Sequence, residues 1–162
     1  METDVTQERL KTLLDYDPET GLFRWKSKAV RNGAHGGRAG NTRPKGYVCI
    51  RIDGRLYMAH RLAWLYVHGM MPTQQIDHIN QIKSDNRIDN LREASPSQNG
   101  QNRSKPRRDN KAGFLGVQRK GNRWIALIGV NGKQQYLGMF ATPEAAHQAY
   151  QKAKAEAHPF AA

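Results

Sequence analysis

The 162-residue sequence is poor in cysteine, in acidic side chains and in long apolar stretches. Cys49 is the only cysteine, which excludes a disulfide within the chain and a zinc site built from cysteine ligands. No apolar run approaches the roughly 20 residues that span a bilayer, and the first residues lack the basic flank and apolar stretch of a secretory signal. We therefore expect a cytoplasmic protein that does not interact with membranes.

Acidic residues are scarce relative to basic ones. Asp and Glu total 14 against 26 Lys and Arg, a net charge of +12, which indicates a polyanionic partner, with nucleic acid ahead of an anionic membrane surface. Residues 105–162 carry ten basic and three acidic side chains, whereas residues 59–104 carry five and four. This split suggests that the middle of the chain performs chemistry and that the C-terminal third holds DNA.

Hydrophobic periodicity predicts a mixture of helices and strands, so the fold class is α+β. Helical spacing and N-cap signals predict helices at 6–14, at 60–68, from 95 onward and from 142 onward. Alternating and β-branched runs predict strands at 22–25, 47–52, 55–58, 115–119, 123–130 and 134–140. Residues 27–45, rich in glycine and basic side chains, are expected to form a flexible loop, either a solvated linker or an arm that contacts phosphates.

The middle of the chain combines residue types that suit phosphodiester hydrolysis. Asp77 and His78 are adjacent, and the segments 84–92 and 97–103 add further amides and charges. A carboxylate beside an imidazole supplies a hard oxygen ligand and a general base at one place, since neutral histidine can deprotonate water near pH 7. An asparagine can orient that histidine, because its amide oxygen accepts from the imidazole N–H.

These segments, in this order, resemble the HNH motif of phage and homing endonucleases. The resemblance also includes His60-Arg61-Leu62-Ala63-Trp64 and the run from Asp15 to Gly21, and it covers roughly residues 8–104. It implies an HNH endonuclease domain at 1–104, with an N-terminal helix and strand region at 1–45. The core, at about 46–104, would be a ββα-metal unit, in which two strands and a helix clamp one divalent ion. It further implies a phage-encoded protein acting in the cytoplasm of a bacterial host cell.

The resemblance also assigns roles to individual residues. Asp77 becomes a metal ligand, His78 the general base and Asn90 the residue that orients His78. Asn99 becomes the second metal ligand, with Asn102 as a substitute. The family often has histidine at this last position, so an amide favours magnesium, or manganese, over zinc. For His60 a functional role stands beside two structural ones, in which it begins its helix or packs under the site.

The C-terminal part is predicted to form three antiparallel strands packed on one helix, at 113–162, after a basic linker at 105–112. Several short segments of this part resemble the ethylene-response-factor (Apetala-two type) DNA-binding domain, among them Arg123-Trp124-Ile125-Ala126 and Leu137-Gly138-Met139-Phe140. A sheet with alternating basic and aromatic residues can lie in the major groove. The predicted DNA contacts are Arg119, Arg123 and Trp124, then Gln118, Lys120 and Lys133, with Arg107 and Arg108 in the linker. The predicted core is Val117, Ile125, Leu127, Leu137, Phe140 and the helix alanines.

Together these features predict a metal-dependent HNH endonuclease that hydrolyses double-stranded DNA and needs no obligatory protein partner. One alternative is a non-catalytic, sequence-specific DNA-binding regulator. The presence of Asp77, His78, Asn90 and Asn99 together argues against it, since a decayed site should lose at least one of them. The other alternative is a general RNA or polyanion binder, and the nearly neutral middle segment argues against that.

Overall fold

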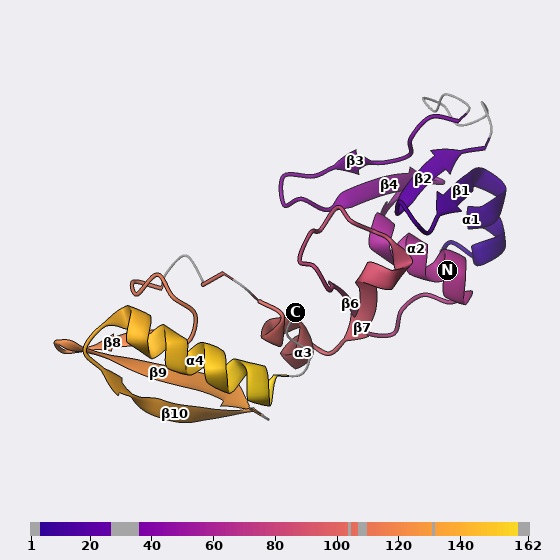
Figure 1. Cartoon of the computed structure of the whole chain (residues 1–162). Helices are drawn as coiled ribbons and strands as arrows, with labels where there is room; N and C mark the ends of the chain where they lie inside the picture. Colours follow the sequence, from indigo (N-terminus) through magenta and orange to yellow (C-terminus); the bar gives the residue numbers. More distant parts are fainter. Residues whose placement is uncertain (1–3, 27–35, 104, 107–109, 131, 159–162) are drawn as a thin grey trace. The chain divides into compact units, whose positions relative to one another are not determined.

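The computed structural model describes residues 4–26, 36–103, 105–106, 110–130 and 132–158. It contains two compact units, Met1–Ser95 and Pro96–Ala162, which are described separately (Figure 1). The sequence analysis placed the domain boundary after residue 104. In the structure, the helix that begins at Pro96 belongs to the second unit. Much of the predicted basic loop, and Arg107 and Arg108 of the predicted linker, lie outside the described residues. In the part that the structure describes, no helix is long and apolar enough to cross a membrane.

The first unit begins with a short helix and a hairpin. Helix α1 (Gln7–Leu13) begins at Thr6, whose side chain accepts a hydrogen bond from the Arg9 amide, as an N-cap residue does. Strands β1 (Leu14–Asp17) and β2 (Leu22–Trp25) pair antiparallel across a turn. The sequence predicted β2 but treated the residues of β1 as the end of a helix and a turn.

A three-stranded sheet and a helix follow. The sheet has the order β3-β4-β5, formed by Asn41–Thr42, Val48–Ile52 and Arg55–Met58. The β4–β5 hairpin turns at Asp53 and Gly54, which both have positive φ, as a two-residue turn of this kind requires. Helix α2 (Ala59–His68) leads directly out of β5 and ends at Gly69, in the left-handed conformation typical of a helix C-terminus.

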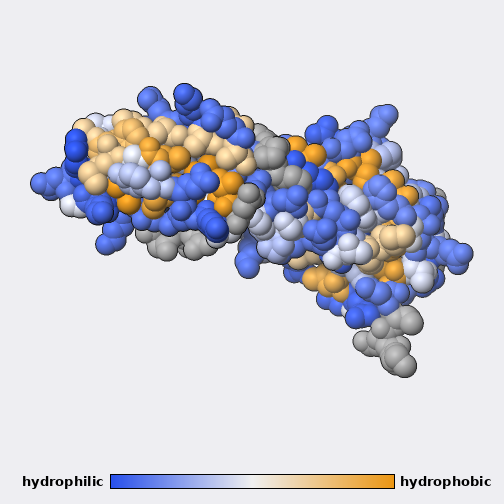
Figure 2. Space-filling model, turned by 90° about the horizontal axis from the view of Figure 1, so that it is seen from below, coloured by the Kyte–Doolittle hydropathy of each residue, from blue (hydrophilic) through white to orange (hydrophobic). Residues whose placement is uncertain are grey.

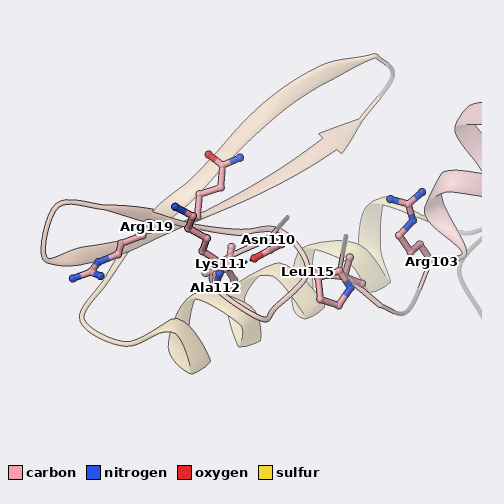
Figure 3. Close-up of a pocket in the computed structure, with 9 residues that line it drawn as sticks. Arg103, Asn110, Lys111, Ala112, Leu115 and Arg119 are labelled. Carbon is pink, nitrogen blue, oxygen red and sulfur yellow. Dashed lines mark hydrogen bonds between the residues drawn. The ribbon is translucent and has the colours of Figure 1, made fainter. Parts of the chain in front are cut away.

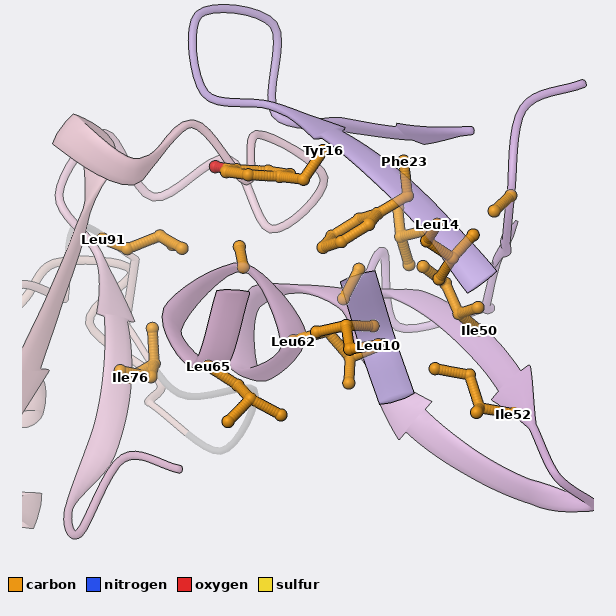
Figure 4. Close-up of a cluster of buried hydrophobic side chains, with 14 residues drawn as sticks. Leu10, Leu14, Tyr16, Phe23, Ile50, Ile52, Leu62, Leu65, Ile76 and Leu91 are labelled. Atoms are coloured by element: carbon orange, nitrogen blue, oxygen red, sulfur yellow. The ribbon is translucent and has the colours of Figure 1, made fainter. Parts of the chain in front are cut away.

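The last hairpin of this unit carries the predicted chemistry. Strand β6 (Gln75–His78) pairs antiparallel with β7 (Leu91–Ala94), and the 3₁₀ turn η1 (Ile88–Asn90) precedes β7. Figure 4 shows α2 at the centre of the core, with Ile76 and Leu91 on one side of it and Leu10, Ile50 and Ile52 on the other. Burying each such side chain contributes about 1.5–3 kcal/mol. The core therefore anchors the β6–β7 hairpin to α2.

The second unit contains α3 (Pro96–Gln101) and a three-stranded antiparallel sheet with α4 (Pro143–Ala157) against it. The strands are β8 (Val117–Lys120), β9 (Arg123–Val130) and β10 (Lys133–Phe140), with β9 in the middle. The core under α4 is thin and is built around Val117, Ala126 and Ala146.

Strand register assigns each residue of this sheet to one of two faces. Val117 pairs with the buried Ala126 on the face that α4 covers, while Gln118 pairs with Ile125 one position away, on the opposite face. Ile125 and Leu127, predicted as core, are only half-buried and lie on that opposite face. The prediction was wrong for these two because adjacent apolar residues on a strand point to opposite sides.

Candidate active site

Asp77 and His78 lie at the end of β6, in a buried hairpin. Both side chains are buried, with 6% and 5% of their surface exposed. Asp77 is opposite Arg92 of β7, and His78 is opposite Leu91. The pairing places a carboxylate and an imidazole next to one another on a strand held by the core, so their positions are set by the hairpin and not by a mobile loop.

Asn86 contacts the imidazole of His78. The Asn86 Oδ1 atom lies 3.2 Å from His78 Nε2, and both residues are buried. The Asn86 amide nitrogen donates to the Ser84 carbonyl, which orients the oxygen toward the histidine. Since that oxygen can only accept, a neutral His78 carries its proton on Nε2 and its lone pair on Nδ1, the nitrogen that can act as a base.

Two residues from the N-terminal hairpin support Asn86. The Tyr16 hydroxyl donates to the Asn86 carbonyl oxygen at 2.7 Å, and burial raises the pKa of Tyr16, so this donor stays protonated. Gly21 has a φ of 69°, and a side chain there would collide with the backbone of Asn86 and Arg87. Only glycine allows the turn after β1 to approach this closely. The sequence showed the run from Asp15 to Gly21 as part of a resemblance, and the structure supplies its physical role.

Asn90 organises the loop between the two strands. Its Oδ1 accepts from the Asn80 amide at 3.0 Å and its Nδ2 donates to the Asp85 carbonyl at 2.8 Å. Its own carbonyl accepts from the Ile79 amide at 2.9 Å. We expected the Asn90 side-chain oxygen to contact the imidazole of His78. It accepts instead from the backbone amide of Asn80, two residues after His78. Sequence spacing had no means of separating the parts played by Asn86 and Asn90, since both are asparagines in one loop.

His60 and Tyr47 surround His78 with aromatic rings. The ring of His60, on α2, meets that of His78 edge to face, with centroids 5.1 Å apart and an interplanar angle of 83°. The Tyr47 ring lies 5.5 Å from His60 and 6.1 Å from His78. His60 is buried, and its Nδ1 has no hydrogen-bond partner among the described residues. His60 therefore packs under the site, one of the two structural roles that the sequence allowed.

Burial keeps both histidines neutral near pH 7. It lowers the pKa of His60 to about 4, and the neighbouring His78 and Arg61 act in the same direction. Burial also lowers the pKa of His78, although Asn86 and the charge of Asp77 oppose this change. A neutral His78 is the protonation state that a general base needs.

Asp77 is bound to the arginine on the neighbouring strand. Arg92 donates to Asp77 Oδ2 from Nε at 3.0 Å and from Nη2 at 2.9 Å. Among the described residues, no group of three or more His, Cys, Asp or Glu side chains could hold a metal ion. One carboxylate with neighbouring amides does not fit zinc, which takes four nitrogen or sulfur ligands in closed sites. It does fit magnesium, which needs one or two carboxylates and keeps water or phosphate oxygens.

Asn99, predicted as the second metal ligand, lies on α3, which belongs to the second unit. Asn102 follows α3 and also belongs to the second unit. Asn102 is buried. The assignment of either residue as a ligand stays a prediction.

The predicted DNA contacts of the second unit are divided between the faces of its sheet. Lys120 and Arg123 pair with each other on the face away from α4. The neighbouring pair, Arg119 and Trp124, lies on the side of the sheet that α4 covers. There the Arg119 guanidinium lies 5.8 Å from the Trp124 ring centroid. Lys133 begins β10, opposite Val130. The five side chains therefore do not form the single alternating face that the sequence suggested.

Arg119 instead borders a basic pocket of about 450 Å³ within the second unit. Arg119 and Arg103 lie at opposite ends of it, with Lys111 between them (Figure 3). Among the described residues no acidic side chain lines the pocket, whose other lining residues are Pro106, Asn110, Ala112, Leu115, Val117 and Gln118.

Residues 57–101 match the model of a family described as HNH endonuclease. The matched segment contains His60, Asp77, His78, Asn86 and Asn90, which the structure brings together, and also Asn99. No curated protein matches the chain significantly, and no solved structure does so either. The segment with the buried Asp-His pair therefore carries an HNH nuclease motif, which supports a nuclease acting on DNA.

Proposed function

We propose that this chain is a metal-dependent HNH endonuclease of the phage or homing type, which hydrolyses phosphodiester bonds in double-stranded DNA. The observation that carries the proposal is the position of His78. Its imidazole is buried, its Nε2 faces the Asn86 oxygen, and it follows Asp77 directly within the segment that matches the HNH family. We further propose that the protein acts in the cytoplasm of a bacterial host.

The chain's own residues divide the work at the scissile phosphate. His78 takes a proton from the attacking water on Nδ1, while Asn86 holds the ring in the tautomer whose lone pair lies on this atom. Asn90 keeps the loop from Asn80 to Asp85 closed, so His78 remains at the end of its strand. His60 and Tyr47 keep bulk water away from the rear of the imidazole.

We assign Asp77 to the divalent ion as its first ligand, and Asn99, or Asn102 in its stead, as the second ligand, as the family resemblance implies. A bound magnesium or manganese ion would stabilise charge on the phosphate and on the leaving 3′ oxygen. The ion pair with Arg92 orients the Asp77 carboxylate, as partners of metal ligands do.

We assign target binding to the C-terminal domain, taken as residues 113–162 after the linker 105–112, in the manner of ethylene-response-factor domains. The ten basic and three acidic side chains of residues 105–162 support this assignment. Of the proposed contacts, Lys120 and Arg123 lie together on the open side of the sheet.

A plasmid-cleavage assay tests the proposal. We expect the full chain to cut supercoiled plasmid with magnesium and to stop when a chelator is in excess. Asp77→Ala should abolish cutting or raise the magnesium requirement, and Asn99→Ala should do the same less severely, since a neutral amide donates less to a hard cation. Asp53→Asn is the control, because Asp53 pairs with Arg9 in the turn between β4 and β5, and asparagine keeps the positive φ that this turn requires. Full activity in excess chelator would exclude the metal mechanism.

A non-catalytic DNA-binding regulator is the second candidate. The observation in its favour is that both Arg92 donors already engage one Asp77 oxygen, which competes with a cation for that carboxylate. In that case neither wild-type protein nor Arg92→Lys would cut plasmid with magnesium or manganese, while duplex DNA would still be bound.

A further inference from the structure

Among the described residues of the second unit, no helix packs on one of the two faces of its sheet. Helix α4 covers the face that carries Val117 and Ala126. The other face, here called the open face, carries the alternate residues of β8, β9 and β10. It includes apolar side chains that reach solvent, since Tyr136 is 59% and Met139 38% exposed. In Figure 2, hydrophobic residues reach the surface between hydrophilic ones in the same way.

The rows across the open face follow from the register. Gln118, Ile125 and Met139 form one row, because both outer residues pair with Ile125. Leu127 pairs with Tyr136 in the next row. Lys120 and Arg123 close one end of the face. The strands β8, β9 and β10 contain no acidic residue, so the apolar rows are bordered only by neutral and basic groups.

Gly129 lies on the open face, in the middle strand, paired with Gln134. Its φ does not lie in the left-handed region, so its backbone conformation does not require glycine. A Cβ added at Gly129 would meet no atom within 4 Å, so packing within the chain does not require glycine either. Glycine weakens a strand interior and often marks a place where a ligand approaches the backbone closely.

We propose that the open face enters the major groove of DNA and reads A·T base pairs there, with Gly129 as the point of closest approach. This inference rests on the proposed assignment of DNA binding to the C-terminal domain and names the class of sequence that it selects. Ile125, Leu127 and Met139 present methyl groups, which contact the thymine methyl, and the Gln118 amide can bond to both polar atoms of an adenine edge.

The arrangement of charge favours A·T over G·C pairs. Guanine is read by two hydrogen bonds from arginine or lysine. Arg119 lies on the other face of the sheet, beside Trp124, and its Nε donates to the Gly121 carbonyl. Lys120 and Arg123 sit at the end of the open face, where they suit phosphates that flank the groove. The centre of the face is therefore apolar and amide-bearing.

The first test uses the full chain in excess chelator, so that binding is measured without cleavage. Duplexes are selected from a randomised library, and the best binder is then remade with deoxyuridine in place of thymidine, which removes only the C5 methyl groups. We expect a selected core rich in A·T pairs and an affinity that falls about fourfold for each methyl group that had been buried. A selected core rich in G·C pairs, or equal affinity for the deoxyuridine duplex, would overturn the proposal.

The second test compares Gly129→Val with Gln135→Val. Both introduce the same side chain into neighbouring strands, but Gln135 pairs with the buried Ile128, on the face of α4, and is exposed. We expect Gly129→Val to keep or raise the melting temperature and to weaken duplex binding about tenfold or more, the loss typical of one wrong base pair. Gln135→Val should bind as the wild type does. If Gly129→Val does not fold, the same comparison of duplex binding is made with Gly129→Ala.

The remaining outcomes distinguish this inference from the proposed nuclease. Unchanged binding by Gly129→Val or Gly129→Ala would overturn the docking face even if the plasmid assay shows cutting. If the full chain is a dimer in solution and Gly129→Val makes it monomeric without affecting duplex binding, the open face holds a second copy and the proposal fails. A lack of plasmid cleavage, with A·T-selective binding retained, would instead reject the nuclease and leave this inference standing.

Discussion

The two units of this protein differ in the size of their cores. The first has a large core of apolar side chains, with Leu10, Leu14, Ile50 and Leu62 almost fully enclosed, and it buries polar groups beside that core. The second has a smaller core around Val117, Ala126 and Ile128, and it also buries Asn102, Lys154 and His158. A thick core can hold polar side chains at set positions, since burial without partners costs about 1–3 kcal/mol per group. A thin sheet with a basic surface is suited to contact with a polyanion.

Because of this difference, we expect the first unit to hold side chains at fixed positions and the second to bind DNA through exposed charge. His78 is held by a hydrogen bond, an adjacent ring and a strand whose Ile76 is packed against the core. Lys120 and Arg123 are exposed and anchored only by their strands. Substitutions in the first unit should therefore alter chemistry or stability, whereas those on the second should alter affinity and its response to salt.

The largest expected effect is the loss of cleavage in His78→Ala. Removing a general base costs about a hundredfold or more in rate. DNA affinity should remain within a factor of about two, because the imidazole handles a proton and is not a phosphate contact. Single-turnover cleavage with magnesium and binding in chelator measure the two quantities. His68→Ala, at the exposed end of α2, is the control; cutting by His78→Ala at the wild-type rate would contradict the assignment of the base.

Asn86→Ala should be the next most damaging change. Without the Oδ1 acceptor, the His78 ring loses the partner that selects its tautomer, and partners of this kind typically contribute about tenfold to a hundredfold. Asn86→Asp should recover part of the rate, because a carboxylate oxygen also accepts. The comparison needs rates at saturating DNA and a melting curve for each variant. Equal rates for wild type and Asn86→Ala would place Asn86 outside the catalytic arrangement.

His60→Phe separates packing from hydrogen bonding beneath the site. Phenylalanine keeps a ring against His78 and removes the buried Nδ1 that has no partner among the described residues. We expect a free energy of unfolding that is unchanged or higher by up to about 1–3 kcal/mol. His60→Ala should lower it by about 2–4 kcal/mol through the cavity it leaves. A loss of stability in His60→Phe equal to that in His60→Ala would show that the nitrogen is needed.

Lys120→Ala and Arg123→Ala should each flatten the salt dependence of binding. The logarithm of the affinity falls with the logarithm of salt concentration by roughly 0.9 per neutralised phosphate, so each variant should lower the slope by about one. Arg9→Ala, a surface arginine of the first unit paired with Asp53, is the matched control. If Arg9→Ala changes the slope and the other two do not, the first unit carries the phosphate contacts.

The smallest effect concerns the loop that Asn90 closes. Hydrogen bonds from Arg87, and then from Asn80, lower the pKa of Asp85 from its ordinary value of 3.8 to about 2. A carboxyl whose folded pKa is depressed stabilises the fold above the unfolded pKa and loses that contribution as pH falls through the folded pKa. Wild type should therefore unfold at a higher temperature than Asp85→Asn above about pH 4, and the gap should close toward pH 2. A gap that stays constant across this range would contradict the ion pair.

Local signals predicted most of the secondary structure. The runs predicted at 123–130 and 55–58 coincide with β9 and β5, because period-two patterns and turn residues are properties of short stretches. The helices at α2 and α4 were equally visible, since Gly69 ends one and Thr142 with Pro143 begins the other. The strands β1, β3, β6 and β7 were not predicted. β1 does alternate apolar and polar residues, but it is only four residues long and Leu14 also fits the helical spacing of the leucines before it.

The sequence by itself determined the composition of the candidate site, since an adjacent Asp77 and His78 with asparagines downstream can be read from the chain. It also determined the excess of positive charge in the C-terminal third. Only the tertiary structure decided that Asn86 and not Asn90 meets the imidazole, that Tyr16 and Gly21 support Asn86 from 65 or more residues away, and that α4 covers the side of the sheet with Arg119 and not the side with Lys120. The reason is physical: composition and period are local, whereas a hydrogen bond between distant residues or the face of a strand depends on register and packing, which are set only when the whole core assembles.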